Sequence, residues 1–354
     1  MSVLSAPVER ASTLTMSDHA VVAPVDEKAW VKILARYREP DSRRSVLELA
    51  VTVIPFLILW TLMLFSLGVG YWLCLLLAVP AAGFLVRLFM IQHDCGHGSF
   101  FRRRVANDAV GRVIGVMTLT PYGYWRRAHA IHHATSGNLE RRGTGDVQML
   151  TVSEYLSLSP WRRLSYRLSR NPVILLTIGP IYVFFLKHRL PAGMTGDREM
   201  WISTMSTNLA IAGVILALSA AVGVENFLLV HLPIMLLASS IGIWLFYVQH
   251  QFEDTYWARD DDWTFHAGAL HGSTHYDLPG PLRWFTANIG IHHVHHLASR
   301  IPSYRLNEVL RDHPALCDMG RLTLRQSFSC FRLALWDEEE QKLVSFRDVR
   351  RVRV

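Results

Sequence analysis

The sequence predicts an all-α polytopic membrane protein, with four transmembrane helices in two hairpins plus interfacial helices and a cytoplasmic helical cap. Three observations predict this fold class. The 354 residues are 51% hydrophobic and only 18% charged, which is less charge than soluble chains carry. Two long stretches, residues 49–86 and 200–252, are uncharged apart from Glu225. The turns that divide these stretches contain none of the 36 lysines and arginines.

The four spans follow from the length of the two stretches. A helix needs roughly 20 apolar residues to cross a bilayer, and a backbone in lipid must satisfy its own hydrogen bonds. With turns at residues 68–70 and 223–226, we expect spans at about 49–67, 71–91, 202–222 and 227–249. Because basic residues mark the cytoplasmic side, both termini and the middle loop are predicted to be cytoplasmic.

Three further segments have a predicted place. Residues 26–38 follow a polar tail and alternate as an amphipathic helix does, ending before Pro40. Residues 172–186 are apolar but number only 15, with Gly179-Pro180 at the centre, so we expect an interfacial or re-entrant segment. Residues 106–119 are expected along the membrane surface. The expected organisation is a cytoplasmic tail and amphipathic helix at 1–48, a membrane domain at 49–335 and a charged C-terminal tail at 336–354.

Charge and cysteine content narrow the possible partners. The net charge is +7, but the sequence contains no zinc-finger pattern and no basic strip interleaved with aromatic residues. We therefore predict no nucleic-acid partner. The four cysteines form no Cys-x-x-Cys pair, which argues against a cysteine metal site or a disulfide framework.

Nine of the 17 histidines fall in three short clusters on the predicted cytoplasmic side: HDCGH at 93–97, HAIHH at 129–133 and HHVHH at 292–296. On a helix, positions i, i+3 and i+4 share a face, so each cluster can direct its rings toward one point. Neutral imidazole is a ligand for iron, zinc, copper and nickel. Eight such ligands are too many for one tetrahedral zinc and suit two metal ions with open positions. Facing a reducing cytoplasm, such a centre suggests iron that activates dioxygen.

Each histidine also has a simpler, structural interpretation. A pair such as His93/His97 would, alone, suit a structural role as well as a functional one. Metal binding is favoured because two triplets and the pair lie on one membrane face. His188, His231 and His313 stand isolated and are expected to be ordinary, and His19 lies in the tail with no argued role.

The three clusters, spaced across two hydrophobic hairpins, resemble the three histidine boxes of the membrane fatty acid desaturases. The resemblance is closest to the bacterial acyl-lipid branch of omega-6, delta-12 type. It extends to HATSGNLERRGTGD at 133–146, WLFYVQHQFEDTYW at 244–257 and LRWFTANIGIHHVHHLASRIPSYRL at 282–306. It implies a non-haem centre of two iron ions that uses dioxygen and two electrons to place a cis double bond in a membrane-lipid acyl chain.

The resemblance also implies a ligand set, carried over by position. Family members use a histidine just past the last transmembrane helix, and His250 occupies that place. The second position of the third box is often aliphatic in the family. Here it is His293, which falls off the shared helix face and is left out. The implied metal ligands are His93, His97, His129, His132, His133, His250, His292, His295 and His296.

Other residues are candidates for supporting roles. Methylene C–H bonds are unactivated, so no catalytic side chain is assigned beyond the metal centre. Carboxylates that could orient the imidazoles are Asp94, Asp146, Glu253, Asp254 and Asp277. Aromatic residues that could line an acyl channel, or form an interface belt, are Trp125, Trp244, Phe246, Tyr247, Trp284 and Phe285. Arginines that could hold a lipid phosphate or an acidic electron carrier, or simply mark the cytoplasmic side, are Arg102, Arg103, Arg104, Arg126 and Arg127.

The electrons are expected to come from a separate protein. The sequence has no haem-binding His-Pro-Gly-Gly segment, no ferredoxin cysteine pattern and no nucleotide-binding glycine motif. Ferredoxin with its reductase is the expected donor, and the bacterial inner membrane the expected location.

Three alternatives remain at this point. A related hydroxylase, or an alkane or carotenoid oxygenase, would carry the same boxes. A membrane zinc metallopeptidase would need His-Glu-x-x-His, whereas this chain has Asp94 and further clustered histidines. A metal transporter would place polar groups near the bilayer midplane rather than at helix ends. The boxes alone do not set the double-bond position or the acyl carrier, which could be lipid, coenzyme A or carrier protein.

Overall fold

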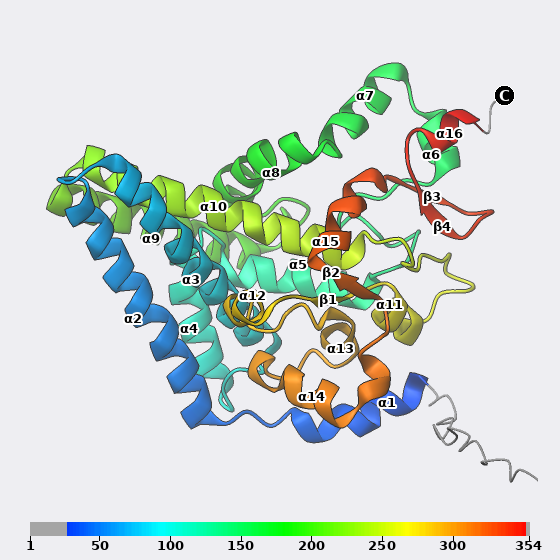
Figure 1. Cartoon of the computed structure of the whole chain (residues 1–354), viewed down its shortest axis with the longest axis horizontal. Coiled ribbons are helices and arrows are strands. Elements are labelled where there is room, and N and C mark those ends of the chain that lie inside the picture. The colour runs from blue at the N-terminus through cyan, green and yellow to red at the C-terminus, as the bar shows by residue number, and fades with distance from the viewer. Residues whose placement is uncertain (1–26, 352–354) are drawn as a thin grey trace, which may run out of the picture.

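The computed structural model describes residues 27–351 and is mostly helical (Figure 1). The polar tail and His19 lie outside the described residues. Four long helices form the predicted pair of hairpins: α2 (Ser42–Ser66) with α3 (Tyr71–His97), and α9 (Arg198–Val222) with α10 (Val224–His250). The α3 helix lies between α2 and α10 and packs against both. The all-α polytopic fold is therefore confirmed.

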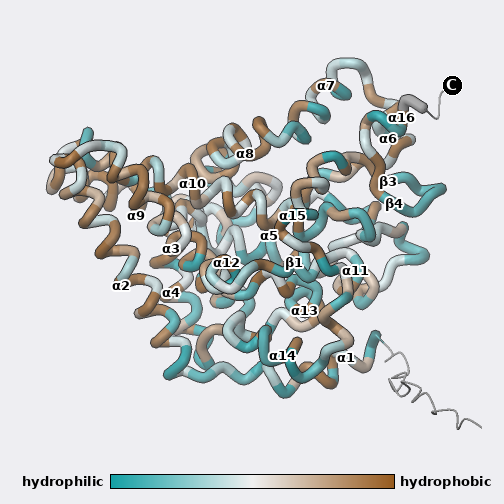
Figure 2. The backbone as a smooth tube through the Cα atoms, viewed as in Figure 1, coloured by the Kyte–Doolittle hydropathy of each residue, from teal (hydrophilic) through white to brown (hydrophobic). Residues whose placement is uncertain are grey.

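The long helices extend beyond the apolar stretches that predicted them. The α2 helix begins at Ser42 because the Asp41 side chain accepts hydrogen bonds from the backbone N–H groups of Arg43 and Arg44. The α3 helix continues through the first histidine cluster and ends at Gly98, whose φ of 66° favours glycine. Hydrophobic residues predominate along α2, α9 and α10, whereas hydrophilic residues are more frequent in the cap (Figure 2).

A fifth described helix is also long and apolar enough to cross a membrane, covering Pro172–Arg189. It comprises α8 (Pro172–Pro180), a π-helical turn η2 (Ile181–Leu186) and η3 (Lys187–Arg189). Pro180 has no N–H to donate to the Leu176 carbonyl four residues earlier. The Ser240 hydroxyl of α10 donates to that carbonyl instead, at 2.7 Å. The helix thus continues through Gly179-Pro180. It extends beyond the 15 apolar residues for which an interfacial or re-entrant segment was expected.

The cap is built from short elements around those ends of the long helices that carry the histidine clusters. The expected amphipathic helix is present as α1 (Glu27–Ile33) and η1 (Leu34–Tyr37), and it buries Trp30, Leu34 and Tyr37 against other cap helices. The helices that complete the cap are α4 (Arg104–Met117), α5 (Tyr122–Thr135), α6 (Val152–Ser157), α7 (Pro160–Ser169), α11 (Phe265–His271), α12 (Gly280–Phe285), α13 (His292–Leu297), α14 (Leu306–Asp312), α15 (Leu324–Ser327) and α16 (Asp348–Arg351).

Two small sheets join distant parts of the cap. Strands β1 (His275–Asp277) and β2 (Arg321–Thr323) pair in parallel, and β3 (Leu335–Asp337) and β4 (Lys342–Val344) pair antiparallel. Trp336 on β3 is 1% exposed, and its backbone N–H donates to the Leu150 carbonyl at 3.0 Å. The segment expected as a charged tail therefore contributes a strand pair to the folded cap.

Candidate metal centre

The centre is formed where four helices meet. His93 and His97 lie on the last turns of α3, and His250 is the final residue of α10. The α5 and α13 helices carry the other two clusters. The Tyr122 hydroxyl on α5 donates to the Cys95 carbonyl of α3 at 2.8 Å, so the first turn of α5 is held against the end of α3. The backbone N–H of His292 donates to Thr274 in the segment that follows α10, at 3.0 Å.

The structure brings all nine predicted histidines together in two adjacent sets. We call them the five-histidine group and the four-histidine group. In each group, one ring nitrogen per residue lies within 4.8 Å of the nitrogens of all the others. The five-histidine group is His93, His97, His129, His133 and His295, and the four-histidine group is His132, His250, His292 and His296.

The nitrogen spacing in the five-histidine group fits a single metal ion. Two imidazole nitrogens at right angles on one ion, each about 2.1 Å from it, lie about 3.0 Å apart. The Nε2 atoms of His97 and His129 are 3.0 Å apart, as are those of His129 and His133. The Nε2 atoms of His133 and His295 are 3.1 Å apart.

In the four-histidine group, two ring nitrogens face each other in a way that suits a bound cation. The Nδ1 of His250 lies 3.0 Å from the Gly272 carbonyl, which can only accept, so Nδ1 carries the proton and Nε2 presents a lone pair. The Nδ1 of His132 contacts the Asp146 carboxylate, which fixes the same tautomer. The Nε2 atoms of these two residues face each other at 3.1 Å. Two lone pairs repel at this distance unless a cation lies between them.

His296 supports the same conclusion. Its side chain is 2% exposed, and neither ring nitrogen has a hydrogen-bond partner among residues 27–351. An unsatisfied buried polar group costs roughly 1–3 kcal/mol. A metal ion in the four-histidine group would satisfy one nitrogen directly.

Burial keeps the cap histidines in the form that binds metal. It lowers the pKa of the imidazoles well below their ordinary value of 6.5, and neighbouring imidazoles lower it further. These groups are therefore neutral near pH 7, with a lone pair available for a ligand bond. The residues concerned are His129, His133, His292, His295 and His296.

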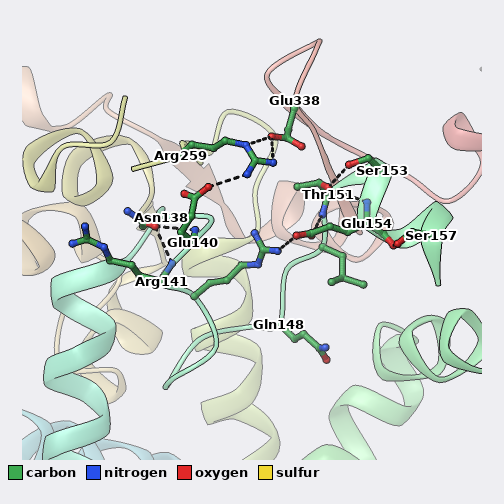
Figure 3. Close-up of polar contacts among 12 residues, drawn as sticks. Asn138, Glu140, Arg141, Gln148, Thr151, Ser153, Glu154, Ser157, Arg259 and Glu338 are labelled. Carbon is green, nitrogen blue, oxygen red and sulfur yellow. Dashed lines mark hydrogen bonds and ion pairs between the residues drawn. The ribbon is translucent and has the colours of Figure 1, made fainter. Parts of the chain in front are cut away.

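The loop after α5 carries Asp146. Polar contacts of other residues in this loop, among them Glu140, fix it to the cap (Figure 3). Arg259 donates to Glu140 in this loop at 2.9 Å and to Glu338 near the C-terminus at 2.8 Å. Arg142 forms an ion pair with Glu154. Asp146 also accepts from the Gly143 N–H at 3.1 Å, so its carboxylate is held toward His132.

The other predicted carboxylates have different partners. Asp94 accepts from the Ser303 N–H at 2.8 Å, and its nearest oxygen is 3.6 Å from His93 Nδ1. Asp94 therefore connects α3 to the cap. Its carboxylate does not point at the centre, as that of a general base would. Asp277 pairs with Arg321 at 2.8 Å, and Glu253 and Asp254 are exposed.

Two of the predicted aromatic residues contact the centre. Trp125 stacks on His129, with ring centroids 4.6 Å apart, and Phe246 lies 5.3 Å from both His132 and His250. The other aromatic residues lie elsewhere. Trp284 and Phe285 on α12 pack against Phe84 of α3, and Trp244 and Tyr247 pack against Phe331 in the cap.

The histidines expected to be ordinary, and His293, lie outside both groups. His293 Nε2 is 2.8 Å from the Leu316 carbonyl, and burial lowers the pKa of His293 to about 3. His231 stacks on Phe227, His188 packs against Phe184, and His313 contacts the Tyr37 hydroxyl at 3.2 Å. Arg126 forms an ion pair with Asp108. The other four predicted arginines are exposed: Arg102, Arg103, Arg104 and Arg127.

One contributor to the site had no signal in the sequence. The Gly272 carbonyl sets the tautomer of His250, but a backbone acceptor does not depend on the side chain that carries it. Only the tertiary approach of the turn after α11 to the end of α10 identifies it.

Comparison with known proteins agrees with this geometry. The sequence model of the family described as "Fatty acid desaturase" matches residues 69–328. The chain is 45% identical to "Fatty acid desaturase" of Bacillus subtilis, over 93% of both chains. It is 31% identical to "sn-1 acyl-lipid omega-3 desaturase (ferredoxin)" of Synechocystis over 70% of both chains. It is 28% identical to "sn-1 oleoyl-lipid 12-desaturase" of Synechocystis over 70% of this chain and 73% of that one. Together with the histidine groups, these matches show that the chain is an enzyme that belongs to the fatty acid desaturase family.

Proposed function

We propose that this membrane enzyme desaturates the acyl chain of a membrane lipid at a centre of two iron ions, with dioxygen as co-substrate. The observation that carries the proposal is the pair of convergent histidine groups, above all the facing lone pairs of His132 and His250. Two hydrogens leave adjacent methylenes as a cis double bond forms. Those hydrogens, two electrons from a donor and two further protons reduce dioxygen to two waters.

Each part of the centre has a role in this proposal. Bound iron supplies the oxidising power that breaks unactivated C–H bonds. The nine histidines hold the two ions, and Asp146 and the Gly272 carbonyl orient His132 and His250 toward them. Trp125 and Phe246 cover the imidazoles with apolar surface and exclude water.

Ferredoxin, kept reduced by its reductase, is the proposed electron donor. Two of the similar cyanobacterial proteins carry "(ferredoxin)" in their names. The exposed arginines of residues 102–104 give the cap a basic surface that suits an acidic donor.

We place the histidines and both termini on the cytoplasmic side of a bacterial inner membrane. The lack of basic residues in both hairpin turns supports this orientation. The histidine positions support four crossings rather than five. If α8, α9 and α10 all crossed, His133 and His295 would face opposite sides, yet their nitrogens are 3.1 Å apart.

The proposed product is a double bond at the delta-12 position of a lipid-bound oleoyl chain. The name of one relative, 28% identical to this chain, supports this position. Other relatives are named omega-3 desaturases, so the position must be read from the product.

The test is the fatty-acid profile of a bacterial host that expresses the chain with a ferredoxin system. We expect a new dienoic acid with wild type, none with His132→Ala, and the wild-type profile with His266→Ala outside both groups. A new hydroxy acid would replace desaturation by hydroxylation, and a single zinc per purified chain would contradict the iron centre. A product whose double bond lies elsewhere would overturn only the delta-12 assignment.

A further inference from the structure

A polar groove of about 430 Å³ lies beside the metal centre and has no role in the function proposed above. The first turns of α2, the middle of α3, α12 and the segment around residues 303–307 form its walls. Its lining includes Arg44, Glu48, Arg87, Arg283, Asn288 and Tyr304.

The groove lies at the boundary between bilayer and water. The uncharged stretch of α2 begins one residue after Glu48, and that of α3 ends one residue before Arg87. Along α2, hydrophobic residues change to hydrophilic ones at this end (Figure 2). Trp284 on the groove wall is 40% exposed, and tryptophan is typical of the headgroup level of a membrane.

A buried ion pair forms the floor of the groove. The Arg87 guanidinium is 5% exposed and donates to Glu48, to the Trp284 carbonyl and to the Thr52 hydroxyl. It also lies 4.1 Å from the centre of the Trp284 ring. These contacts fix a positive group at the membrane boundary, where an unpaired charge would be costly.

The lining carries more positive than negative charge. Glu48 is its one carboxylate and pairs with both Arg44, at 2.7 Å, and Arg87. Arg283 lies 3.6 Å from Asp277, which Arg321 approaches more closely, at 2.8 Å. The side chains of Arg44 and Arg283 are 53% and 39% exposed, so both can reach a ligand.

We propose that this groove binds the phosphate of a membrane phospholipid headgroup. Guanidinium groups bind phosphate oxygens in pairs of hydrogen bonds, and Asn288, Asn307 and Tyr304 add neutral polar groups around them. The surroundings of the groove favour a lipid over an acidic protein, because Leu282 and Trp284 on α12 are 42% and 40% exposed and offer apolar surface beside the arginines. Arg87 precedes His93 by six residues on α3, about 9 Å along the helix axis.

A lipid phosphate in the groove would also lie near Ser303, which is bonded to a residue next to a predicted metal ligand. Ser303 lines the groove, and its N–H donates to Asp94, the residue after His93. The proposal nevertheless depends on neither iron nor the reaction, so lipid binding is its readout.

The experiment uses the full-length chain, delipidated in detergent and titrated with phosphatidylglycerol, with native mass spectrometry to count bound lipid. Arg44→Gln/Arg283→Gln removes two groove charges, and Arg162→Gln/Arg325→Gln removes two exposed charges outside the groove. We expect the apparent Kd to rise roughly tenfold or more in the first variant, since each basic group near a lipid surface contributes about a factor of five. The second variant should change it less than about twofold.

Further measurements separate loss of lipid binding from loss of folding, and a phospholipid from other ligands. Arg44→Gln alone spares the bonds of Arg283 to the Leu278 carbonyl and should raise the Kd about fivefold. Iron content and thermal unfolding report whether each variant folds. A galactolipid with the same acyl chains should bind poorly, and millimolar inorganic phosphate should not displace phosphatidylglycerol. Equal losses in both double variants, equal binding of the galactolipid, or displacement by phosphate would overturn the proposal.

Discussion

The rings of His133 and His296 stack 4.1 Å apart between their centroids and within 11° of parallel. His133 belongs to the five-histidine group and His296 to the four-histidine group, so this pair joins the two groups. The α5 and α13 helices each contribute to both groups. The two groups therefore adjoin and share a pair of stacked imidazole rings.

The groups should differ in their tolerance of a lost ligand. His133→Ala leaves four histidines in its group, whereas His296→Ala leaves three. We expect about two iron ions per wild-type chain, nearly as many in His133→Ala, and about one in His296→Ala, as measured by elemental analysis of purified protein. His266→Ala is the control. Equal iron loss in both histidine variants would instead show that the two groups fill only together.

Asp146→Asn should weaken metal binding without removing a ligand. The carboxylate holds His132 in the tautomer that presents Nε2 to the four-histidine group, and loss of such a partner typically costs 10–100-fold in metal affinity. Iron retained during titration with a chelator measures the effect. Asp254→Asn, at an exposed carboxylate in the segment after α10, should behave as wild type. Unchanged retention of iron in Asp146→Asn would show that Asp146 does not support metal binding.

His293→Ala should reduce stability but not iron content. His293 is fully buried and bonded to the Leu316 carbonyl, outside both groups, so its loss leaves an unpaired acceptor and a small cavity. We expect a loss of about 1–3 kcal/mol, visible as a lower midpoint of thermal unfolding in detergent. The neighbouring His292→Ala should lose iron. Loss of iron in His293→Ala, with a native-like unfolding midpoint, would contradict this assignment.

Acid should release the metal and destabilise the metal-free protein. Burial holds the pKa of His129, His133 and His295 below the ordinary value of about 6.5. Below that pH the unfolded chain takes up protons that the folded chain does not, so the unfolding free energy is highest above about pH 6.5 and falls as the pH decreases. Protonation of ligands also competes with iron. Iron content and thermal unfolding between about pH 8 and 5 test this, and a flat response would contradict it.

Local patterns predicted much of the fold and of the centre. The two uncharged stretches predicted both hairpins. The i, i+3, i+4 spacing of His129, His132 and His133 predicted a shared helix face, but the expectation that their rings meet at one point was wrong, because His132 joins the other group. By the same spacing, His293 falls off the helix face that its neighbours in the cluster share. Such features depend only on residues within a few turns of one another.

Contacts between distant segments could not be predicted in this way. Asp254 is close to His250 in sequence but faces solvent, whereas Asp146 reaches His132 because a loop folds back over α5. The helix through Pro180 continues because Ser240, far along the chain, satisfies the carbonyl that proline leaves free. Trp336 is buried against the strand-like segment at Leu150, although the surrounding residues are charged.

The division of the third cluster between the two groups has a consequence for biosynthesis. His295 completes one group and His296 the other, so the first group cannot close until the ribosome has made residue 295, nor the second until residue 296. Both hairpins precede that point and can insert first. Under the proposed function, iron would therefore be loaded late, after both hairpins have been inserted. Cells starved of iron should accumulate inserted chains whose cap is open to proteases.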